Sequence, residues 1–467
     1  MNLRIVAAGL HRRLALLLLA GAVAIAGCAY TLVRGGRIDE PKAAGVIDAI
    51  QKIRDLRFKQ QVPMAVKTAD EAELLMEADL ARDYTDEQIG VDGAAGALVG
   101  LYPAGIDLKA ETLRLLKSQV AGFYDPHNKQ MVLVEGASDL GFWTNATEFL
   151  VQRDYVGEML LAHELTHALQ DQNFELEKKL DQVKDDDDRG LALKSVAEGD
   201  ATIAGLACVI GKMDQSTLDS LVSRLGKIPQ LFAAQSAGTP QGLSAPLVFQ
   251  YSDGVRFVAE AYRRGGWSGV DELYRTPPLS SHQILHPELY FDHLAPPPQI
   301  SLDGYQAVMP NWTKADDDTY GELLLRVILE RNVGKDSAEV RLAAQWSGDR
   351  MIMLSKGRSL TVLWMIAFND NRSAARFAAV YASVLDRLPG SAPHAIDYRG
   401  DAVLVVIGEG ASYSRSLMPA VWQASRIAGA PVAPGQVRLR TVDATAKRVP
   451  GAMRQRLVRA ESDAQSR

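Results

Sequence analysis

Apolar residues along this chain recur mainly at helical spacing in its first two thirds. Ile47, Ile50 and Ile53 begin the pattern, which predicts a helix soon after residue 42. Further helical stretches are predicted over 71–82, 148–180, 188–210 and 246–267, the last closed by glycines 265 and 266. One segment differs, because two extended pieces between Phe123 and Val134 flank turn-forming residues and predict a β-hairpin.

From residue 301 to about 430, helical patterns (320–331 and 373–388) alternate with strand-like apolar runs (351–354, 359–366 and 402–407). A proline-rich segment precedes this change, so we place a domain boundary near residue 300. The predicted fold class is α+β: a unit over 42–300 that is helical with a small mixed sheet, then a smaller α+β unit of unknown role over 301–430. The basic residues of 431–467 predict a flexible tail.

The first residues have the layout of a secretory signal. Three arginines precede an apolar run from Leu14 to Ala26, which is too short to span a bilayer comfortably. The run ends in Ala26-Gly27-Cys28, which resembles the bacterial lipobox and implies a signal peptide over 1–27, a lipid on Cys28 and a tether over 28–41. A plain membrane anchor, or an ordinary signal with a coincidental cysteine, is the alternative. Ala29 after the cysteine resembles outer-membrane sorting, facing the periplasm, if the host has two membranes.

Composition and charge narrow the possible partners. The 467 residues are 47% hydrophobic, enough to fill two cores. Without residues 1–27 the formal charge moves from -6 to -9, because three arginines and no acids are lost. A mildly acidic chain of this kind argues against nucleic acid as a partner. Cys208 is the cysteine that remains beside Cys28, so an internal disulfide is not expected.

The strongest chemical signal is the sequence His163-Glu164-Leu165-Thr166-His167 within an apolar helical stretch. Two histidines four residues apart return to the same helix face, where both imidazoles can bind one zinc ion. Glu164 lies between them in sequence and can take a proton from a zinc-activated water that attacks a peptide carbonyl. The alternative is a pair of hydrogen-bonded histidines on a core helix.

A catalytic zinc usually has three protein ligands and keeps a fourth position for water. A third histidine on the same chain turn, as in metzincins, is excluded because Gln170 and Asn173 occupy the diagnostic positions. Glu198 on the next predicted helix is the expected third ligand, as in gluzincins; an ordinary surface carboxylate is the alternative. Asp200 lies about 200° further round that helix, so we expect it behind the ligands, holding a histidine in one tautomer.

Two further roles have weaker candidates. A donor to the oxyanion of a tetrahedral intermediate is expected, and His286 and Tyr290 are the candidates, with Tyr251 a weaker one. The strand over 130–134 is either an edge strand that pairs with an extended peptide substrate or an internal strand of its sheet.

These motifs together resemble a group of bacterial and archaeal gluzincin-type metallopeptidases. The likeness implies a zincin-like domain over 42–300, one Zn²⁺ per chain, a peptide or protein substrate, and a lipoprotein of the cell envelope. An envelope scaffold or chaperone with a structural zinc is the alternative, and a solute-binding lipoprotein without metal is a third. The resemblance rests on His163 to Gln172, Glu198 to Ala201, Tyr124 to Pro126, Tyr251 to Phe257, Pro277 to Tyr290 and Ala343 to Arg350.

Overall fold

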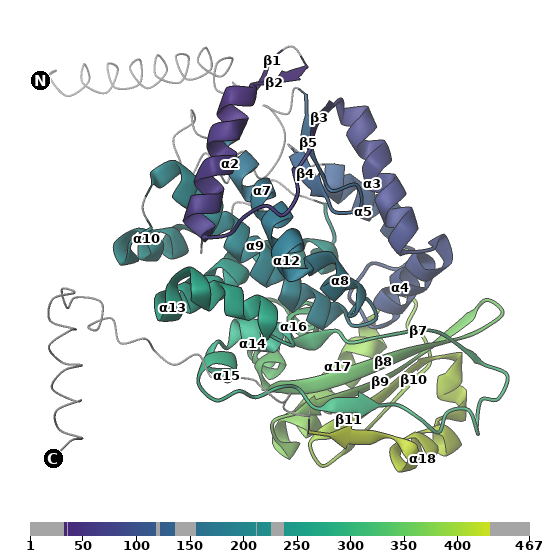
Figure 1. Cartoon of the computed structure of the whole chain (residues 1–467). Coiled ribbons are helices and arrows are strands. Elements are labelled where there is room, and N and C mark those ends of the chain that lie inside the picture. The colour runs from purple at the N-terminus through teal and green to yellow at the C-terminus, as the bar shows by residue number, and fades with distance from the viewer. Residues whose placement is uncertain are drawn as a thin grey trace, which may run out of the picture.

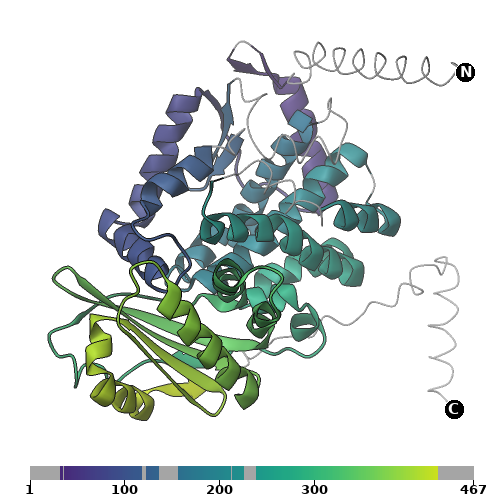
Figure 2. The same cartoon turned by 180° about the vertical axis from the view of Figure 1, so that it is seen from behind.

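A computed structural model of the chain describes residues 32–34, 36–117, 122–135, 156–211, 213–225 and 238–429. Helices pack around a small sheet in one part, and a five-stranded sheet with its own helices lies below them in both views (Figures 1 and 2). This mixture confirms the predicted α+β class. The predicted signal peptide, Cys28 and the basic tail over 431–467 lie outside the described residues.

The predicted tether is wrong from residue 32 onward, because the chain is folded there. Leu32 is 5% exposed and packs in an apolar cluster with Ile50 of the first long helix. Strands β1 (Val33–Arg34) and β2 (Arg37–Ile38) pair, and α2 (Glu40–Arg54) follows directly. Asp39 caps that helix by accepting a hydrogen bond from the Lys42 amide, so folding begins before residue 42.

The predicted hairpin is confirmed as β4 (Gly122–Asp125) and β5 (Gln130–Val134), which pair antiparallel. Asp125 fixes the turn by accepting the backbone amides of His127 and Asn128. A third strand, β3 (Met64–Lys67), pairs parallel with β5, so the sheet order is β3-β5-β4. The strand over 130–134 is therefore internal and cannot receive a substrate strand; β4 lies at the edge of the sheet.

Two long helices cross the helical part side by side. They are α7 (Val156–Phe174) and α9 (Asp187–Ile210), and both pack against α2. The helix predicted over 148–180 ends earlier than expected, because Glu175 adopts a left-handed conformation before the short α8 (Leu176–Asp181). The surrounding helices are α3 (Ala69–Asp83), α4 (Asp86–Leu98), α5 (Leu108–Lys117), α10 (Gln215–Leu225), α12 (Gln241–Phe249), α14 (Ser281–Leu285) and α15 (Glu288–Phe291).

Between α12 and the next helix, five residues form a π-helical turn, η3 (Gln250–Gly254), which leads into α13 (Val255–Arg275). The sequence predicts that this helix closes at glycines 265 and 266. Gly266 does leave the helical conformation, with φ 61°, but the helix continues beyond this kink to Arg275. The local glycine signal is therefore overridden by the apolar residues that follow, such as Val270 and Leu273, both fully buried.

The C-terminal sheet is an antiparallel array in the order β10-β11-β9-β8-β7. Alternate residues face opposite layers: Trp364 packs with helices α16 (Gly321–Val333) and α17 (Asn371–Arg387), and Met365 packs with α18 (Ser414–Ala424). Because both faces are covered, the strands show continuous apolar runs. The strands are β7 (Thr313–Asp318), β8 (Trp346–Lys356), β9 (Ser359–Phe368), β10 (His394–Arg399) and β11 (Ala402–Gly408).

Packing crosses the boundary predicted near residue 300. Val99, after α4, lies in the same apolar cluster as α16 and α17, and its carbonyl accepts a hydrogen bond from the Tyr381 hydroxyl. Strands β6 (Gln299–Ser301) and β12 (Arg426–Ala428) also pair, which ties the boundary segment to the end of the described chain. The two predicted units thus share an apolar core.

The start of α16 sits in a tight junction. Asp349 of β8 accepts the backbone amides of Tyr320 and Gly321, so a buried carboxylate holds the helix N-terminus. Gly321 has φ +70°, and a Cβ there would lie 1.9 Å from the Asp188 carboxylate at the start of α9. Only glycine fits between these two helix starts.

Replacing Gly321 with alanine should therefore lower the free energy of unfolding by about 2–4 kcal/mol, through backbone strain and the clash with Asp188. Urea denaturation followed by circular dichroism measures this change. Gly334→Ala is the matched control, since Gly334 also has a positive φ but a Cβ there meets nothing within 4 Å. Equal losses in the two variants would show that contact with Asp188 does not matter.

Candidate active site

Helices α7 and α9 bring the three predicted ligands together. The His163 and His167 Nε2 atoms lie 3.2 Å apart, and Glu198 Oε2 lies 3.1 Å from the first and 3.5 Å from the second. A tetrahedral zinc with bonds of about 2.0–2.1 Å separates neighbouring ligand atoms by about 3.3 Å. The three atoms therefore form a triangle of the size that a zinc ion requires, with one tetrahedral position left over.

Glycines allow the backbone of α9 to come this close to its neighbours. A Cβ at Gly205 would lie 3.0 Å from the Met159 carbonyl oxygen and 3.3 Å from the His163 amide on α7. A Cβ at Gly199 would lie 2.6 Å from the Gly254 carbonyl of η3. The glycine that follows Glu198 is thus needed for helix packing, which keeps Glu198 opposite the histidines.

The charged side chains of this cluster strongly shift one another's pKa. Burial would raise the pKa of Glu198, but the two histidines hold it well below its ordinary value. Burial lowers the pKa of His167, and Glu198 outweighs this effect and raises it to about 10. The Glu198 carboxylate thus faces a His167 imidazole that holds its proton in the field of this carboxylate, and a bound cation can take the place of that proton.

Glu164 lies on α7 beside the cluster and faces the edge strand β4. Its Oε2 atom accepts a hydrogen bond from the Tyr124 amide at 3.1 Å. Burial raises the pKa of Glu164 above its ordinary value, although the neighbouring histidines lower it. A carboxylate with a raised pKa, next to a metal-sized triangle and a strand edge, is suited to accept and release protons.

Asp200 acts behind the ligands, but not by direct contact as expected. His167 Nδ1 contacts Gln170 Oε1 at 2.9 Å, and Gln170 Nε2 donates to Asp200 Oδ2 at 3.1 Å. The Gln170 amide also donates to the Ala197 carbonyl, which fixes its orientation. Because a side-chain amide oxygen only accepts, His167 Nδ1 carries the proton and Nε2 is left to face the cluster.

The sequence reasoning missed Arg54, which pairs with Asp200. The Arg54 Nε atom lies 2.8 Å from Asp200 Oδ1, and both side chains are completely buried. Arg54 also pairs with Asp271 at 2.8 Å and lies over the Trp267 ring, while the Tyr274 hydroxyl donates to Asp200 at 2.8 Å. An arginine at the end of an amphipathic helix gives no local signal of a partner 146 residues away.

The three candidates for the oxyanion donor lie in different surroundings. Tyr251 of the π-helical turn stacks on His163, with ring centroids 6.2 Å apart, and its hydroxyl hydrogen-bonds with Glu198. His286 instead lies in a second cluster with His282 and Glu322. The Tyr290 hydroxyl donates to the Thr276 carbonyl. The structure thus brings the weakest sequence candidate, Tyr251, to the predicted ligands, while His286 and Tyr290 make their contacts with other residues.

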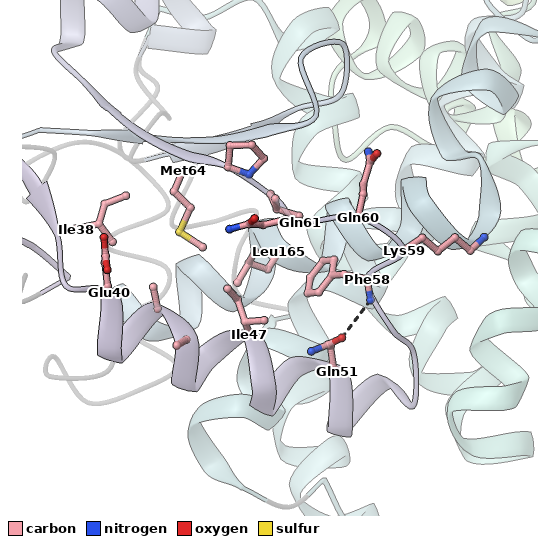
Figure 3. A pocket seen from close by; sticks show the side chains of 14 residues that line it. Ile38, Glu40, Ile47, Gln51, Phe58, Lys59, Gln60, Gln61, Met64 and Leu165 are labelled. Carbon is pink, nitrogen blue, oxygen red and sulfur yellow. Dashed lines mark hydrogen bonds between the residues drawn. The ribbon is translucent and has the colours of Figure 1, made fainter.

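A cavity of about 610 Å³ lies between α2 and the chain segment 58–64 (Figure 3). Apolar side chains dominate it, and the Phe58 amide donates to Gln51 at its wall. Leu165 of α7 reaches this cavity, whereas the ligand residues and Glu164 are not among the residues that line it. The cavity is therefore separate from the candidate active site.

Within the part of the chain that the structure describes, no helix has the length and apolarity needed to cross a membrane. Cys208 of α9 is a free cysteine within the described part of the chain.

The chain resembles few known proteins in the comparisons of sequence and structure. A family model described as a domain of unknown function (DUF8575) matches residues 308–419, which include the five-stranded sheet and Glu322 but none of the proposed zinc ligands. No curated protein matches the chain. One solved structure, described as a "putative hydrolase with a novel fold" from Chloroflexus aurantiacus, is similar over 58% of this chain and 95% of that one. The two chains are 14% identical in sequence, and the TM-score is 0.39.

Arg54→Met should lower the free energy of unfolding by about 3–5 kcal/mol, because it leaves Asp200 buried without its cation. Chemical denaturation of the variant measures this loss. Arg263→Met is the control: Arg263 pairs with the exposed Asp219, and such surface pairs contribute about 1 kcal/mol or less. Comparable losses in both variants would mean that the buried pair is not a special element of the fold.

Proposed function

We propose that the chain is a zinc-dependent peptidase of the gluzincin type. The observation that carries the proposal is the triangle formed by His163 Nε2, His167 Nε2 and Glu198 Oε2, with Glu164 beside it. Two imidazoles and one carboxylate with a free fourth position are the donor set of catalytic zinc sites. Zinc bound there would polarise a substrate carbonyl and lower the pKa of a water molecule to about 7.

Glu164 is the general base in this proposal. It takes the proton of the attacking water and then passes it to the amine that leaves when the peptide bond breaks. Its position next to β4 supports this role, because the edge of that strand offers backbone groups along which an extended peptide can align. Substrates are thus extended peptides or unfolded protein segments.

Tyr251 replaces His286 as the proposed oxyanion donor. Burial and the neighbouring Glu198 raise the pKa of Tyr251 well above its ordinary value, so the phenol keeps its proton. A neutral phenol beside the ligands can donate a hydrogen bond to the carbonyl oxygen as negative charge develops on it. The π-helical turn sets this position, and such turns are frequent at functional sites.

The cellular location belongs to the same proposal. It rests on the signal-like segment over 1–27 and on Cys28, which would anchor the chain in the envelope through a lipid. The zincin-like identity of the 42–300 unit likewise rests on the resemblance of its motifs and on the ligand triangle.

Glu164→Gln should reduce cleavage of an unstructured, fluorescently labelled protein by at least about 100-fold, because the amide cannot take a proton. Zinc content, measured by elemental analysis of the full chain in detergent, should match the parent. Glu158→Gln on the same helix is the control and should remain active. A chelator should abolish parental activity, and added zinc should restore it. Full activity of Glu164→Gln would remove this residue from the mechanism.

Tyr251→Phe should lower kcat by about 100-fold with little change in KM, because the donated hydrogen bond matters mainly in the transition state. Steady-state kinetics on a peptide substrate separate the two constants. Tyr262→Phe, which loses a hydroxyl bonded to the Met213 carbonyl, is the matched control and should keep the parental kcat. An unchanged kcat in Tyr251→Phe would assign the oxyanion role to another group.

A further inference from the structure

A second cluster of metal-ligand type lies at the junction of the two predicted units. His282 Nδ1 lies 2.5 Å from Glu322 Oε2, and His286 Nε2 lies 2.9 Å from the same oxygen. The two imidazole rings are 4.6 Å apart. Ligand atoms of all three residues lie within 4.8 Å of one another, as do those of the first cluster. The proposed peptidase activity uses none of these residues.

His282 lies in α14 and His286 is the residue that follows this helix, and buried hydrogen bonds hold the helix in place. The two histidines are four residues apart, and the His286 amide donates to the His282 carbonyl, so the helical turn is intact. Ser280 caps this helix by accepting the Gln283 amide. The Ser281 amide donates to Asp188 of α9 at 3.0 Å, and the Ser281 hydroxyl accepts the Leu323 amide of α16. The histidine-bearing helix is thus fastened to both neighbouring helices.

Glu322 is positioned from the other side of the junction. It belongs to the first turn of α16, whose start is held by Asp349 through the amides of Tyr320 and Gly321. Trp346 donates to Asp349 and also packs edge-on against His282, with centroids 5.6 Å apart. His282 and Glu322 therefore rest on groups that are themselves fixed, as in preorganised metal sites.

The three side chains of this cluster differ in how far they are buried. The exposed fraction of the side chain is 4% for Glu322, 11% for His282 and 31% for His286. The carboxylate is thus removed from water, while His286 lies at the surface and provides a route for an ion to enter. A buried carboxylate with two converging imidazoles offers one oxygen and two nitrogens, a donor set suited to divalent first-row transition metals.

We propose that His282, His286 and Glu322 form a second metal site, for a divalent first-row transition ion, which clamps α14 to α16. Such an ion would bind the two histidines from the unit before residue 300 and a carboxylate from the unit after it. Its role is structural: it joins the two units at a point where backbone hydrogen bonds already align them. This proposal does not depend on peptidase activity.

The test counts metal ions in a protein whose first cluster has been removed. His163→Ala/His167→Ala is made in the full chain, purified in detergent, stripped with a chelator, and loaded with Zn²⁺ or Co²⁺ before gel filtration. We expect about one ion per chain and a Co²⁺ absorption band. Adding Glu322→Gln should reduce the bound metal at least tenfold. Adding His394→Ala, which removes a histidine near Asp386, should leave it unchanged.

Zinc should also raise the thermal unfolding midpoint of the His163→Ala/His167→Ala protein by about 2 °C or more, and this shift should vanish with Glu322→Gln. If that variant does not fold, His286→Ala decides the matter, because His286 is partly exposed and its removal leaves no buried cavity. Zinc binds such donors more tightly than Mn²⁺ or Fe²⁺. A protein lacking the first cluster that takes up no zinc, or whose zinc persists in both second-cluster variants, overturns the proposal and leaves a hydrogen-bonded clamp without metal.

Discussion

The buried ion pair between Arg54 and Asp200 is the interaction on which the helical part depends. It joins the end of α2 to the middle of α9, and Asp271 and Tyr274 of α13 complete its surroundings. A buried pair of this kind contributes little net stability relative to apolar packing, since both ions lose their hydration. We infer that its effect is specificity, because a packing that separated the two residues without exposing them to water would leave a buried charge without a partner.

The same pair connects stability with the candidate chemistry. Asp200 accepts a hydrogen bond from Gln170, and Gln170 contacts Nδ1 of His167. The Gln170 amide therefore orients the His167 imidazole, and the Asp200 carboxylate orients that amide. Arg54 in turn neutralises the charge of Asp200. The helix packing and the candidate site share one hydrogen-bond network, so the residues behind the proposed ligands are as constrained as those ligands.

The sequence predicted correctly those features that are formed by residues close together along the chain. The two histidines of α7 are one turn apart, and the turn at Asp125 is formed by neighbouring residues, so both could be recognised without knowing the fold. Glu198 was predicted from the gluzincin pattern, in which a carboxylate on a second helix completes the ligand set. The extent of the tether was wrong because Leu32 is buried by residues of distant helices, and the break at Glu175 lies inside an otherwise continuous helical pattern.

Groups that meet across long sequence separations could not be predicted in this way. Nothing near Arg54 indicates Asp200, and nothing near His286 indicates Glu322, which is 36 residues further along in a different packing layer. Strand order is another case, because the hairpin predicted β4 and β5 as neighbours but gave no sign that β3 adds to β5 and makes it internal. Tyr251 was undervalued because the π-helical turn that directs its ring has no distinct composition.

Through contacts with helix α9, the C-terminal unit helps to position the candidate active site. At its start, Asp188 is fixed by the Ser281 amide and its own amide donates to the Thr319 carbonyl, so this end is bound to the junction. Glu198 follows ten residues later, about 15 Å along the helix axis. Gly205 then presses the same helix against α7 beside His163. Because Asp188 and Glu198 lie on one continuous helix, the contacts at Asp188 help to fix the position of Glu198 relative to the histidines. The second unit therefore belongs to the framework that sets the ligand triangle.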